Sequence, residues 1–464
     1  MTKILQDIAS ARAALLAMPV PRYTSYPTAN HFCETIDQSD WLGAMSRLPE
    51  AAPLSLYLHI PYCETICTYC GCTTKLLTRA ERLERYVERL LVEIERKSAL
   101  LNAGYSHKRP VSHIHFGGGT PNLLTQAQLE RILSCLSHAF DIRPDAEIAM
   151  EFDPRVMTRE QVFAFTSLGV NRASLGVQSF APEVQQAINR VQPISKVQKA
   201  VDDLRDAGIG GINFDLVYGL PLQTLDDVIE DCRLTAQMGA DRVAIFGYAH
   251  VPHVRPAQRK LDGLHRAEPK MREAMALAAH QALSDARYAA LGIDHFARPE
   301  DSLAIATSQG LLRRNFQGYT ADGAVALVGF GVSAISTAPG LFCQNPVRQK
   351  MWEDMIDEDG PFRFPRGLSI AAEDQCRAAI IEAIMCNRPI NPAMAATRFG
   401  LPANLFTPEL EALEHDARLG LVDPLQLQQG VIMPGEGAHQ FTRIIASRFD
   451  TWLNPEAGRH AQAV

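Results

Sequence analysis

The 464-residue sequence has no basic excess, no long apolar run and no secretion signal. It holds 45 Lys and Arg against 52 Asp and Glu, a formal net charge of −7, which argues against nucleic acid or an anionic membrane as the main partner. Because no run of about 18 apolar residues exists, we expect no membrane-spanning helix. The apolar stretch Ala13 to Met18 follows Asp7 and Arg12 and is too short for a signal-peptide core. We therefore expect a cytoplasmic protein.

Cysteine is unevenly distributed along the chain. Four of the ten cysteines fall within ten residues, at Cys63, Cys67, Cys70 and Cys72. A secreted protein of this length could carry disulfides, but the sequence shows no secretion signal. A reducing compartment and a metal site explain the clustering better than disulfide bridges do.

The length predicts one large domain with one or two smaller parts, because a domain usually holds about 100 to 200 residues. Three prolines within the first 27 residues limit helix formation there, and we assign residues 1–50 to an N-terminal arm. Residues 51–366 form the predicted main domain with its extension. Residues 367–464 form a small, mainly helical, winged-helix-like domain.

The C-terminal domain has few basic residues. Residues 391–464 hold five Arg, no Lys and eight Asp or Glu, which argues against DNA as its ligand. We expect helices with short connections and a hairpin near residues 421–433.

From residue 54 onward, strand patterns alternate with helical patterns. The expected strands are 54–60, 113–116, 147–153, 172–177, 211–217 and 242–247. The expected helices include 79–101, 125–140, 158–168, 196–207 and 224–238. Strand–helix units in this order predict a parallel sheet with right-handed crossovers.

One face of each of the first five expected strands is polar. Tyr57 and His59 share the polar face of the first strand, and Glu147 and Glu151 share that of the third. A doubly wound sheet buries both faces and would show continuous apolar runs. A curved sheet with helices outside and a polar, ligand-filled lumen fits better, and six units are fewer than the eight of a closed barrel. The sequence therefore predicts an α/β fold built on a partial, open (β/α)6 TIM-like barrel.

A Cys63-Glu-Thr-Ile-Cys67-Thr-Tyr-Cys70 motif follows the first expected strand. Three thiolates on one loop can hold three irons of a [4Fe–4S] cluster, which leaves the fourth iron open to another ligand. The alternative is a zinc knuckle with Cys72 or His59 as fourth ligand. Zinc sites usually pair two separated half-motifs, and no second half is evident.

A glycine-rich segment, Gly117-Gly-Gly-Thr-Pro121, ends the second expected strand. Three glycines allow the backbone to approach a ligand closely, although a tight strand–helix turn would also need them. Beside the cysteine motif we favour the ligand-binding interpretation.

These motifs resemble those of the radical S-adenosylmethionine (SAM) superfamily. Its cluster motif matches the three cysteines, Tyr69 stands at its usual aromatic position, and the partial barrel is its fold. The resemblance implies that the open iron binds SAM and that one electron from the cluster cleaves SAM to a 5′-deoxyadenosyl radical. Such a radical can take hydrogen from an unactivated carbon.

Over nearly the whole chain the sequence is similar to one family, the oxygen-independent coproporphyrinogen III oxidases of haem biosynthesis. The matching segments include Pro21-Arg-Tyr-Thr-Ser-Tyr-Pro27, Cys70-Gly-Cys72, Glu151-Phe-Asp-Pro154, Gly176-Val-Gln-Ser-Phe180, Asp215-Leu-Val-Tyr-Gly-Leu-Pro221, Tyr248-Ala-His-Val-Pro252 and Arg314-Asn-Phe-Gln-Gly-Tyr-Thr320. The family binds two SAM molecules in one barrel. One departure is Gly247, where bacterial members tend to have asparagine.

The resemblance assigns the predicted site residues. Contacts to the cluster-bound SAM are expected from Tyr57, Gly118, Glu151 and Ile335. Contacts to a second SAM are expected from Tyr69, Gly119, Thr120, Gln178, Arg190, Asp215 and Ala249. Cys63, Cys67 and Cys70 hold the cluster, and Cys72 is the candidate catalytic residue, near the substrate or the second SAM.

The resemblance also implies the reaction, in which two propionate side chains of coproporphyrinogen III become vinyl groups and protoporphyrinogen IX forms. A one-electron reductant such as a flavodoxin or ferredoxin would be a partner, and the chain would be a monomer. The four substrate carboxylates point to basic residues, for which Arg22 and Arg298 are candidates.

The alternative is a haem-binding chaperone of the same family. Such relatives usually lack the Pro21–Pro27 arm and a cysteine at the position of Cys72, so both features favour the oxidase. The segment Gly329-Phe-Gly-Val-Ser-Ala334 also matches a dinucleotide fingerprint, but it opens no βαβ unit and we reject NAD binding there.

Overall fold

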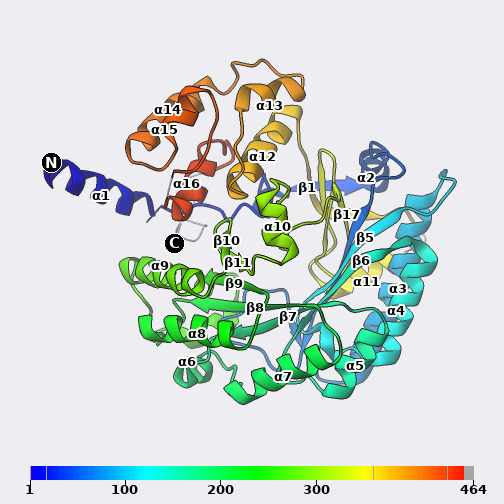
Figure 1. Cartoon of the computed structure of the whole chain (residues 1–464). Coiled ribbons are helices and arrows are strands. Elements are labelled where there is room, and N and C mark those ends of the chain that lie inside the picture. The colour runs from blue at the N-terminus through cyan, green and yellow to red at the C-terminus, as the bar shows by residue number, and fades with distance from the viewer. Residues whose placement is uncertain (1, 17, 359, 436, 454–464) are drawn as a thin grey trace.

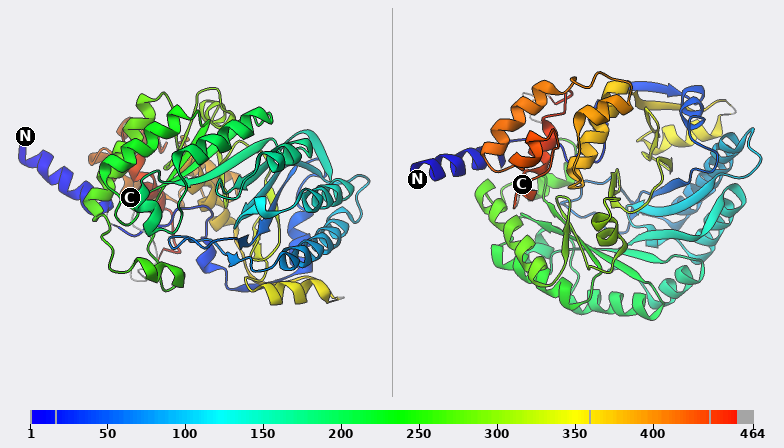
Figure 2. Two further views of the ribbon diagram at one scale, coloured as in Figure 1. Left: turned by 90° about the horizontal axis from the view of Figure 1, so that it is seen from below. Right: turned by 45° about the horizontal axis from the view of Figure 1, so that its top comes forward.

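The computed structural model describes residues 2–16, 18–358, 360–435 and 437–453. Its centre is a 13-stranded sheet in the order β1-β17-β16-β15-β14-β2-β5-β6-β7-β8-β9-β11-β10. The neighbouring strands from β14 to β9 in this order are parallel. Helices run along the outer side of the curved sheet, as the right-hand view of Figure 2 shows.

The six expected strand–helix units are all present, and the partial-barrel prediction is confirmed. The strands are β2 (Leu54–Ile60), β5 (Pro110–Gly118), β6 (Asp141–Phe152), β7 (Arg172–Gln178), β8 (Gly211–Tyr218) and β9 (Arg242–Gly247). The helices that follow them are α3 (Ala80–Asn102), α4 (Gln126–Ala139), α5 (Arg159–Ser167), α6 (Pro182–Ala187), α7 (Ile194–Asp206), α8 (Leu225–Gln237) and α9 (Pro269–Asp285).

Alternating burial explains how these units pack. Leu54, Leu56 and Leu58 of β2 are fully buried in the core that the outer helices share. Each such side chain contributes about 1.5 to 3 kcal/mol by leaving water. Tyr57 and His59, on the opposite face of the strand, line the lumen. Helix starts are fixed locally, since Thr125 and Thr224 form capping boxes at α4 and α8.

A seventh parallel strand, β14 (Ala326–Phe330), pairs with β2 from the other side. It continues into an antiparallel edge of β15 (Ile335–Ala338), β16 (Leu341–Gln344) and β17 (Arg363–Ser369). The dinucleotide-like glycine segment joins β14 to β15, and no helix follows it. The opposite edge is formed by β11 (His295–Ala297) and β10 (Ala289–Leu291).

The N-terminal segment is partly built into this sheet. It forms α1 (Thr2–Leu16), η1 (Ala29–His31), β1 (Glu34–Asp37) and α2 (Gln38–Met45). Because β1 pairs with β17, residues 34–37 belong to the main sheet and not to a free arm. The expected boundary between residues 366 and 367 falls inside β17, so the last three residues of that strand lie beyond it.

The C-terminal segment is helical, as Figure 1 shows above the barrel. It comprises α12 (Ala372–Met385), α13 (Pro392–Arg398), α14 (Thr407–Arg418), α15 (Pro424–Gln428), η4 (His439–Phe441) and α16 (Thr442–Ser447). The prediction of a hairpin near residues 421–433 was wrong, because α15 occupies this stretch. Asp423 caps α15 with Pro424 at its first position, a combination that starts a helix. The described residues after α12 pair as strands only at two isolated bridges, Ile390 with Ile432 and Val422 with Pro434.

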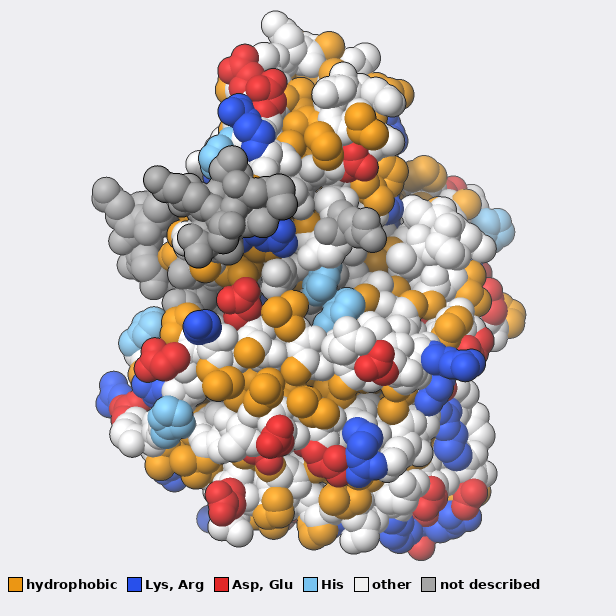
Figure 3. Space-filling view, turned by 60° about the vertical axis from the view of Figure 1, so that its left-hand side comes forward, with side chains coloured by type: hydrophobic (Ala, Val, Ile, Leu, Met, Phe, Trp, Pro, Cys, Tyr) orange, Lys and Arg blue, Asp and Glu red, His pale blue; other side chains and the backbone are white. Residues whose placement is uncertain are grey.

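The remaining elements are short. They are β3 (Tyr62–Cys63), β4 (Lys75–Leu76), η2 (Pro121–Leu123), η3 (Pro256–Leu261), α10 (Ser302–Ser308), β12 (Arg313–Asn315), β13 (Gly318–Thr320) and α11 (Gln349–Asp357). None of the described helices has the length and apolarity needed to cross a membrane. On the face drawn in Figure 3, acidic and basic side chains are interspersed.

The segment after α1 is clamped against the C-terminal helices. Tyr23 Oη donates to Asp450 Oδ2 at 2.9 Å, and Tyr26 Oη lies 3.0 Å from Thr451 Oγ1. Arg443 is buried and donates to the main-chain carbonyls of residues 20 and 21. These bonds fix the course of the segment between the two parts of the molecule.

Candidate active site

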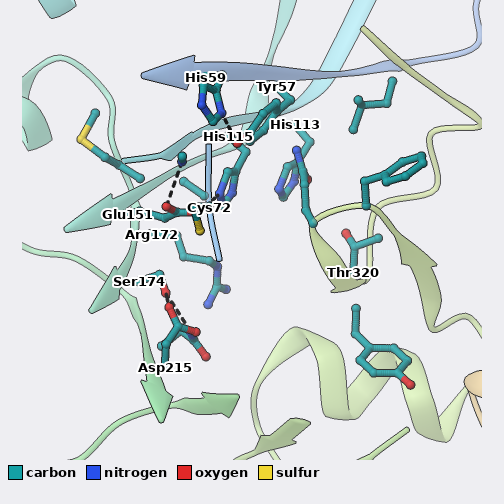
Figure 4. Close-up of a pocket in the computed structure, with 18 of the residues that line it drawn as sticks. Tyr57, His59, Cys72, His113, His115, Glu151, Arg172, Ser174, Asp215 and Thr320 are labelled. Atoms are coloured by element: carbon teal, nitrogen blue, oxygen red, sulfur yellow. Dashed lines mark hydrogen bonds and ion pairs between the residues drawn. The ribbon is translucent and has the colours of Figure 1, made fainter. Parts of the chain in front are cut away.

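A cavity of about 440 Å³ fills the lumen of the partial barrel. Side chains from the polar faces of β2, β5, β6, β7 and β8 form its walls (Figure 4). The predicted site residues that line it are Tyr57, Cys72, Gly118, Glu151, Asp215 and Ile335. Cavities of several hundred Å³ are the size that small ligands and cofactors occupy.

The loop between β2 and β4 carries the three cysteines of the motif. Cys67 Sγ accepts hydrogen bonds from Arg155 Nη2 and Arg190 Nη1, both at 3.6 Å. Cys70 Sγ accepts one from the backbone N–H of Cys72 at 3.4 Å. Donors of this kind stabilise a thiolate, which is the form of cysteine that binds iron.

Cys70 and Cys72 form a pair with opposite pKa shifts. The side-chain hydrogen bond with Cys72 lowers the pKa of Cys70 to about 6. The same hydrogen bond, together with the charge of Cys70, raises the pKa of Cys72. Cys72 therefore keeps its proton, and its sulfur lies beside Glu151 in the lumen (Figure 4). This distribution of charge fits Cys70 as a ligand and Cys72 as a neutral thiol.

The sulfur ligands of the loop suit an iron–sulfur cluster. Within the described residues, no three His, Cys, Asp or Glu side chains form a group that could hold one metal ion. A [4Fe–4S] cubane is wider and spreads its ligands over separate irons. The two guanidinium groups beside Cys67 would offset the negative charge of such a cluster. His59, the alternative zinc ligand, instead contacts the Thr73 carbonyl at 3.0 Å and Tyr57 Oη at 3.1 Å.

The glycine-rich turn packs directly against the cysteine loop. Its main-chain N–H groups donate to two carbonyls of the β2–β3 segment at 2.8 Å each. A Cβ on Gly119 would lie 2.6 Å from the Tyr62 carbonyl oxygen, and one on Gly118 would lie 2.5 Å from the His59 ring. Gly118 also has φ +116°, where side chains are disfavoured. These contacts alone require glycine, whatever ligand the turn also meets.

Tyr57, His115 and Glu151 form one wall of the lumen. The Tyr57 and His115 rings are stacked with centroids 5.9 Å apart. His115 Nε2 lies 3.4 Å from Glu151 Oε1, and the Gly118 N–H donates to Glu151 Oε2 at 3.0 Å. Burial acts to raise the pKa of Glu151, but the hydrogen bond and charge of His115 and the Gly118 N–H outweigh it and lower that pKa. Glu151 is therefore an oriented carboxylate.

Asp215 lies on the facing part of the same cavity (Figure 4). Ser174 Oγ donates to its Oδ2 at 2.8 Å, and Asn213 Nδ2 donates to its Oδ1 at 2.9 Å. Burial, and secondly the charge of Glu151, raise the pKa of Asp215. The lumen thus holds two carboxyl groups whose pKa values are shifted in opposite directions.

Other residues expected at a second SAM gather behind the cysteine loop instead of lining the lumen cavity. Arg190 is buried and donates to the Gly176 carbonyl at 3.1 Å and to Asp153 Oδ2 at 3.3 Å, besides Cys67. Gln178 ends β7 with φ +70°. Thr120 forms a side-chain hydrogen bond with Cys63, whose pKa burial raises to about 11.

Tyr69 and Ala249 are brought together by a residue that the sequence did not single out. Gln258 Nε2 donates to the Tyr69 carbonyl at 2.8 Å and to the Ala249 carbonyl at 3.2 Å. Gln258 is buried in η3. These two hydrogen bonds join the cysteine loop to the segment after β9. The only sequence signal near Gln258 was the matched segment that ends at Pro252.

Asp153 and Arg155 were also missed as a pair. Arg155 Nη2 donates to Asp153 Oδ2 at 2.7 Å and to Cys67 Sγ at 3.6 Å, so the pair connects β6 to the cysteine loop. The matched Glu151-Phe-Asp-Pro segment contains Asp153 and ends one residue before Arg155, and it was the sequence signal that could have identified the pair.

The two arginines proposed for the substrate lie in different places. Arg22 Nη2 donates to the Gly247 carbonyl at 2.8 Å, Nη1 lies 3.8 Å from Asp294 Oδ2, and its guanidinium covers the Phe246 ring at 5.3 Å. Phe246 lines the lumen cavity, whereas Arg22 itself lines a separate cavity of about 70 Å³ together with Gly247, Asp294 and Arg443. Arg298 instead covers the Tyr288 ring, and it too is not among the residues that line the lumen cavity.

The departure at Gly247 has a structural counterpart. A Cβ at this position would lie 3.0 Å from Arg272 Nη2 and 3.0 Å from Tyr218 Oη. Arg272 Nη1 donates to the Tyr248 carbonyl at 2.8 Å. The arginine of α9 thus occupies the space that a longer side chain at residue 247 would need.

Comparisons with known proteins agree with this architecture. Residues 57–235 match the model of the radical SAM superfamily. The chain is 40% identical to an oxygen-independent coproporphyrinogen III oxidase of Bradyrhizobium diazoefficiens over 96% of this chain and 97% of the relative. It is 37% identical to the Escherichia coli enzyme of the same name over 94% of each.

A solved structure of the Escherichia coli coproporphyrinogen III oxidase, a radical SAM enzyme, superposes with a TM-score of 0.87 and 36% identity, covering 93% of this chain and 97% of that one. The full-length match, the barrel and the three-cysteine loop at its mouth lead to one assignment. The chain belongs to the oxygen-independent coproporphyrinogen III oxidase family of the radical SAM superfamily.

Proposed function

We propose that this chain oxidatively decarboxylates two propionate side chains of coproporphyrinogen III to vinyl groups and so produces protoporphyrinogen IX. The observation that carries the proposal is the cysteine loop, with its three free thiols and its guanidinium and amide donors, at the mouth of a polar lumen in a chain of this family. A [4Fe–4S] cluster with SAM supplies the one-electron chemistry that removes hydrogen from an unactivated carbon. Cys63, Cys67 and Cys70 would hold the cluster.

The lumen side chains are suited to orient a SAM molecule. Glu151 is an ionised carboxylate fixed by His115 and Gly118, and a fixed carboxylate suits a ribose diol or an amino group. Tyr57 offers a ring face, and Gly118 and Ile335 leave room along the same wall. We assign these four residues to the cluster-bound SAM.

We further assign a second SAM to Tyr69, Gly119, Thr120, Gln178, Arg190, Asp215 and Ala249. Asp215 faces the lumen, and Arg190 is a buried cation near the loop. Equilibrium dialysis tests the stoichiometry, with two SAM per chain expected. A single site in the wild-type protein would refute the pairing.

Arg22 supplies a positive charge where a propionate of the substrate would enter. Its side chain is about one-third exposed and covers Phe246, a residue that lines the lumen cavity. Its main chain is held by Arg314, which donates to the carbonyls of residues 22 and 23 at 3.1 and 3.2 Å. A guanidinium in a fixed position suits a carboxylate.

Anaerobic turnover of coproporphyrinogen III with SAM and a reductant tests the function directly. We expect two CO₂ and one protoporphyrinogen IX per substrate. Stoichiometric haem retention without turnover would support the chaperone alternative, which no finding favours. We also propose that the chain acts as a cytoplasmic monomer, and light scattering at micromolar concentration checks the monomer.

A further inference from the structure

The three cysteines of the loop do not receive the same hydrogen bonds. Cys67 is buried, and its Sγ accepts from two charged donors, Arg155 Nη2 and Arg190 Nη1, at 3.6 Å each. The other two motif cysteines have a neutral main-chain N–H and a neutral side-chain hydroxyl as their partners within the described residues. Positive charge is therefore concentrated at one of the three expected cluster ligands.

One carboxylate partly balances this charge. Asp153 Oδ2 accepts from Arg155 Nη2 at 2.7 Å and from Arg190 Nη1 at 3.3 Å. Asp153 is itself held in place, because its N–H donates to Asn122 Oδ1 at 2.9 Å. The side chains of the two arginines and the aspartate are no more than 15% exposed, so little water screens their charges. Two guanidinium groups and one carboxylate leave a net positive charge beside Cys67.

The Arg155 guanidinium has a fixed orientation toward the loop. The Arg155 main-chain N–H donates to Asp153 Oδ1 at 3.0 Å, and its Nη1 donates to the Asn189 carbonyl at 3.4 Å. Asn189 Nδ2 in turn donates at 3.0 Å to the carbonyl of Ile66, the residue before Cys67. Arg155 is not among the residues that line the lumen cavity. Its contacts are thus directed at the cysteine loop and not at that cavity.

We propose that Arg155 is a positioning residue that raises the reduction potential of the [4Fe–4S] cluster through its charged hydrogen bond to Cys67. The proposal rests on the function assigned above, in which the loop holds the cluster. On reduction, a one-electron donor loses one electron and the cluster gains it, without transfer of a proton or a group. The cluster with its thiolates then carries one more negative charge. A cation that donates to a ligand sulfur stabilises this form, and hydrogen bonds to sulfur and net charge set the potentials of such clusters.

A redox titration of the anaerobically reconstituted full-length protein tests the proposal, with the reduced cluster followed by electron paramagnetic resonance and with no SAM or substrate added. Arg155→Met removes the charge and keeps the length of the side chain. At the potential where the wild-type cluster is half reduced, we expect the ratio of reduced to oxidised cluster to fall about tenfold, a shift of about 59 mV for a one-electron couple. Arg155→Lys keeps the charge and should stay closer to wild type.

Asp153→Asn provides a test of opposite sign. It removes the negative charge beside the two arginines and keeps an oxygen that can accept from them, so the midpoint potential should rise. A purely structural role of the Asp153–Arg155 pair would not move the two variants in opposite directions. This variant also decides the question if Arg155→Met binds too little iron to titrate, since a midpoint at or below that of the wild type would then overturn the proposal.

Arg205→Met is the matched control. Arg205 Nη2 also pairs with an aspartate, Asp241, at 2.6 Å and donates to a main-chain carbonyl. It lies at the amino end of β8, whereas the cysteine loop follows the carboxyl end of β2, and the eight residues of β8 span roughly 25 Å. Its midpoint should equal that of the wild type.

Two results would overturn the assignment: a wild-type midpoint in Arg155→Met, or shifts of the same sign in Arg155→Met and Asp153→Asn. A wild-type protein that assembles no [4Fe–4S] cluster would instead refute the proposed function.

Discussion

Gly118 offers the sharpest test of how the lumen and the cysteine loop depend on each other. Its φ is +116°, and a Cβ there would lie 2.5 Å from His59 Cε1 and 2.6 Å from His59 Nδ1. The variant Gly118→Ala must therefore distort the turn, displace His59, or do both. His59 is buried and is held by Tyr57 and by the Thr73 carbonyl.

The cost can be estimated from these contacts. Backbone strain at this φ costs about 1 to 3 kcal/mol, and overpacking against a fixed ring costs about 1 to 3 kcal/mol. Together they lower the free energy of unfolding by about 2 to 6 kcal/mol. Displacement of His59 also loosens Thr73 in the loop, so we expect reduced iron content after anaerobic reconstitution.

Gly210→Ala is the matched control, because a Cβ at Gly210 meets nothing within 4 Å and its φ is not in the positive range. Guanidinium unfolding followed by circular dichroism, with iron and sulfide analysis, measures both effects. An unfolding midpoint and iron content for Gly118→Ala that match those of Gly210→Ala would refute the reasoning from the Gly118–His59 contact.

Four further variants extend the test. Cys67→Ala should lose the [4Fe–4S] cluster, and four irons retained per chain would contradict the ligand assignment. Cys72→Ser should retain the cluster but lower turnover, because the protonated thiol faces the lumen and does not bind iron; full turnover would leave it a structural role. Arg22→Gln should raise KM for coproporphyrinogen III about tenfold with a smaller change in kcat, as loss of one charged hydrogen bond predicts, and an unchanged KM would exclude a propionate contact. Burial, and secondly the charge of His280, lower the pKa of His439 to about 4. Below about pH 6.5 the unfolded chain binds a proton at this residue while the folded chain does not, so the free energy of unfolding should fall as the pH drops from 6.5 toward 4. His439→Phe should flatten this decline in unfolding midpoints measured at pH 4.5 and 7.

Much of the fold could be predicted because the alternation of polar and apolar residues is a local pattern within each strand. Alternation of polar and apolar residues within strands such as 54–60 reports which face meets the helices, and it led directly to the lumen. The strand β14 was not assigned to the parallel sheet, since it pairs with β2 across more than 260 residues of sequence and no local pattern records such a pairing. At α15, Asp423 followed by Pro424 indicates the start of a helix, and the hairpin prediction did not take this pattern into account.

The site was predictable in composition but not in arrangement. The polar strand faces predicted Glu151 in the lumen, and the resemblance added Cys72 and Asp215. The structure brings all three to one cavity. The resemblance assigned Arg190 as a contact to a second SAM. In the structure Arg190 donates hydrogen bonds to Asp153, Gly176 and Cys67. The sequence could not predict these partners, because tertiary packing determines which acceptors lie beside a buried arginine.

The C-terminal segment holds the residues around Arg22 in place, a role that its sequence alone did not indicate. Its acidic balance argued against DNA, and the structure shows that it holds the segment around Arg22 through Asp450, Thr451 and the buried Arg443. A neutral hydrogen bond contributes about 1 kcal/mol net, so several such bonds give this otherwise irregular segment a fixed course. A fixed course is what places the Arg22 guanidinium over the Phe246 ring. The C-terminal segment therefore fixes the course of the residues that carry Arg22, which is proposed above to contact the substrate.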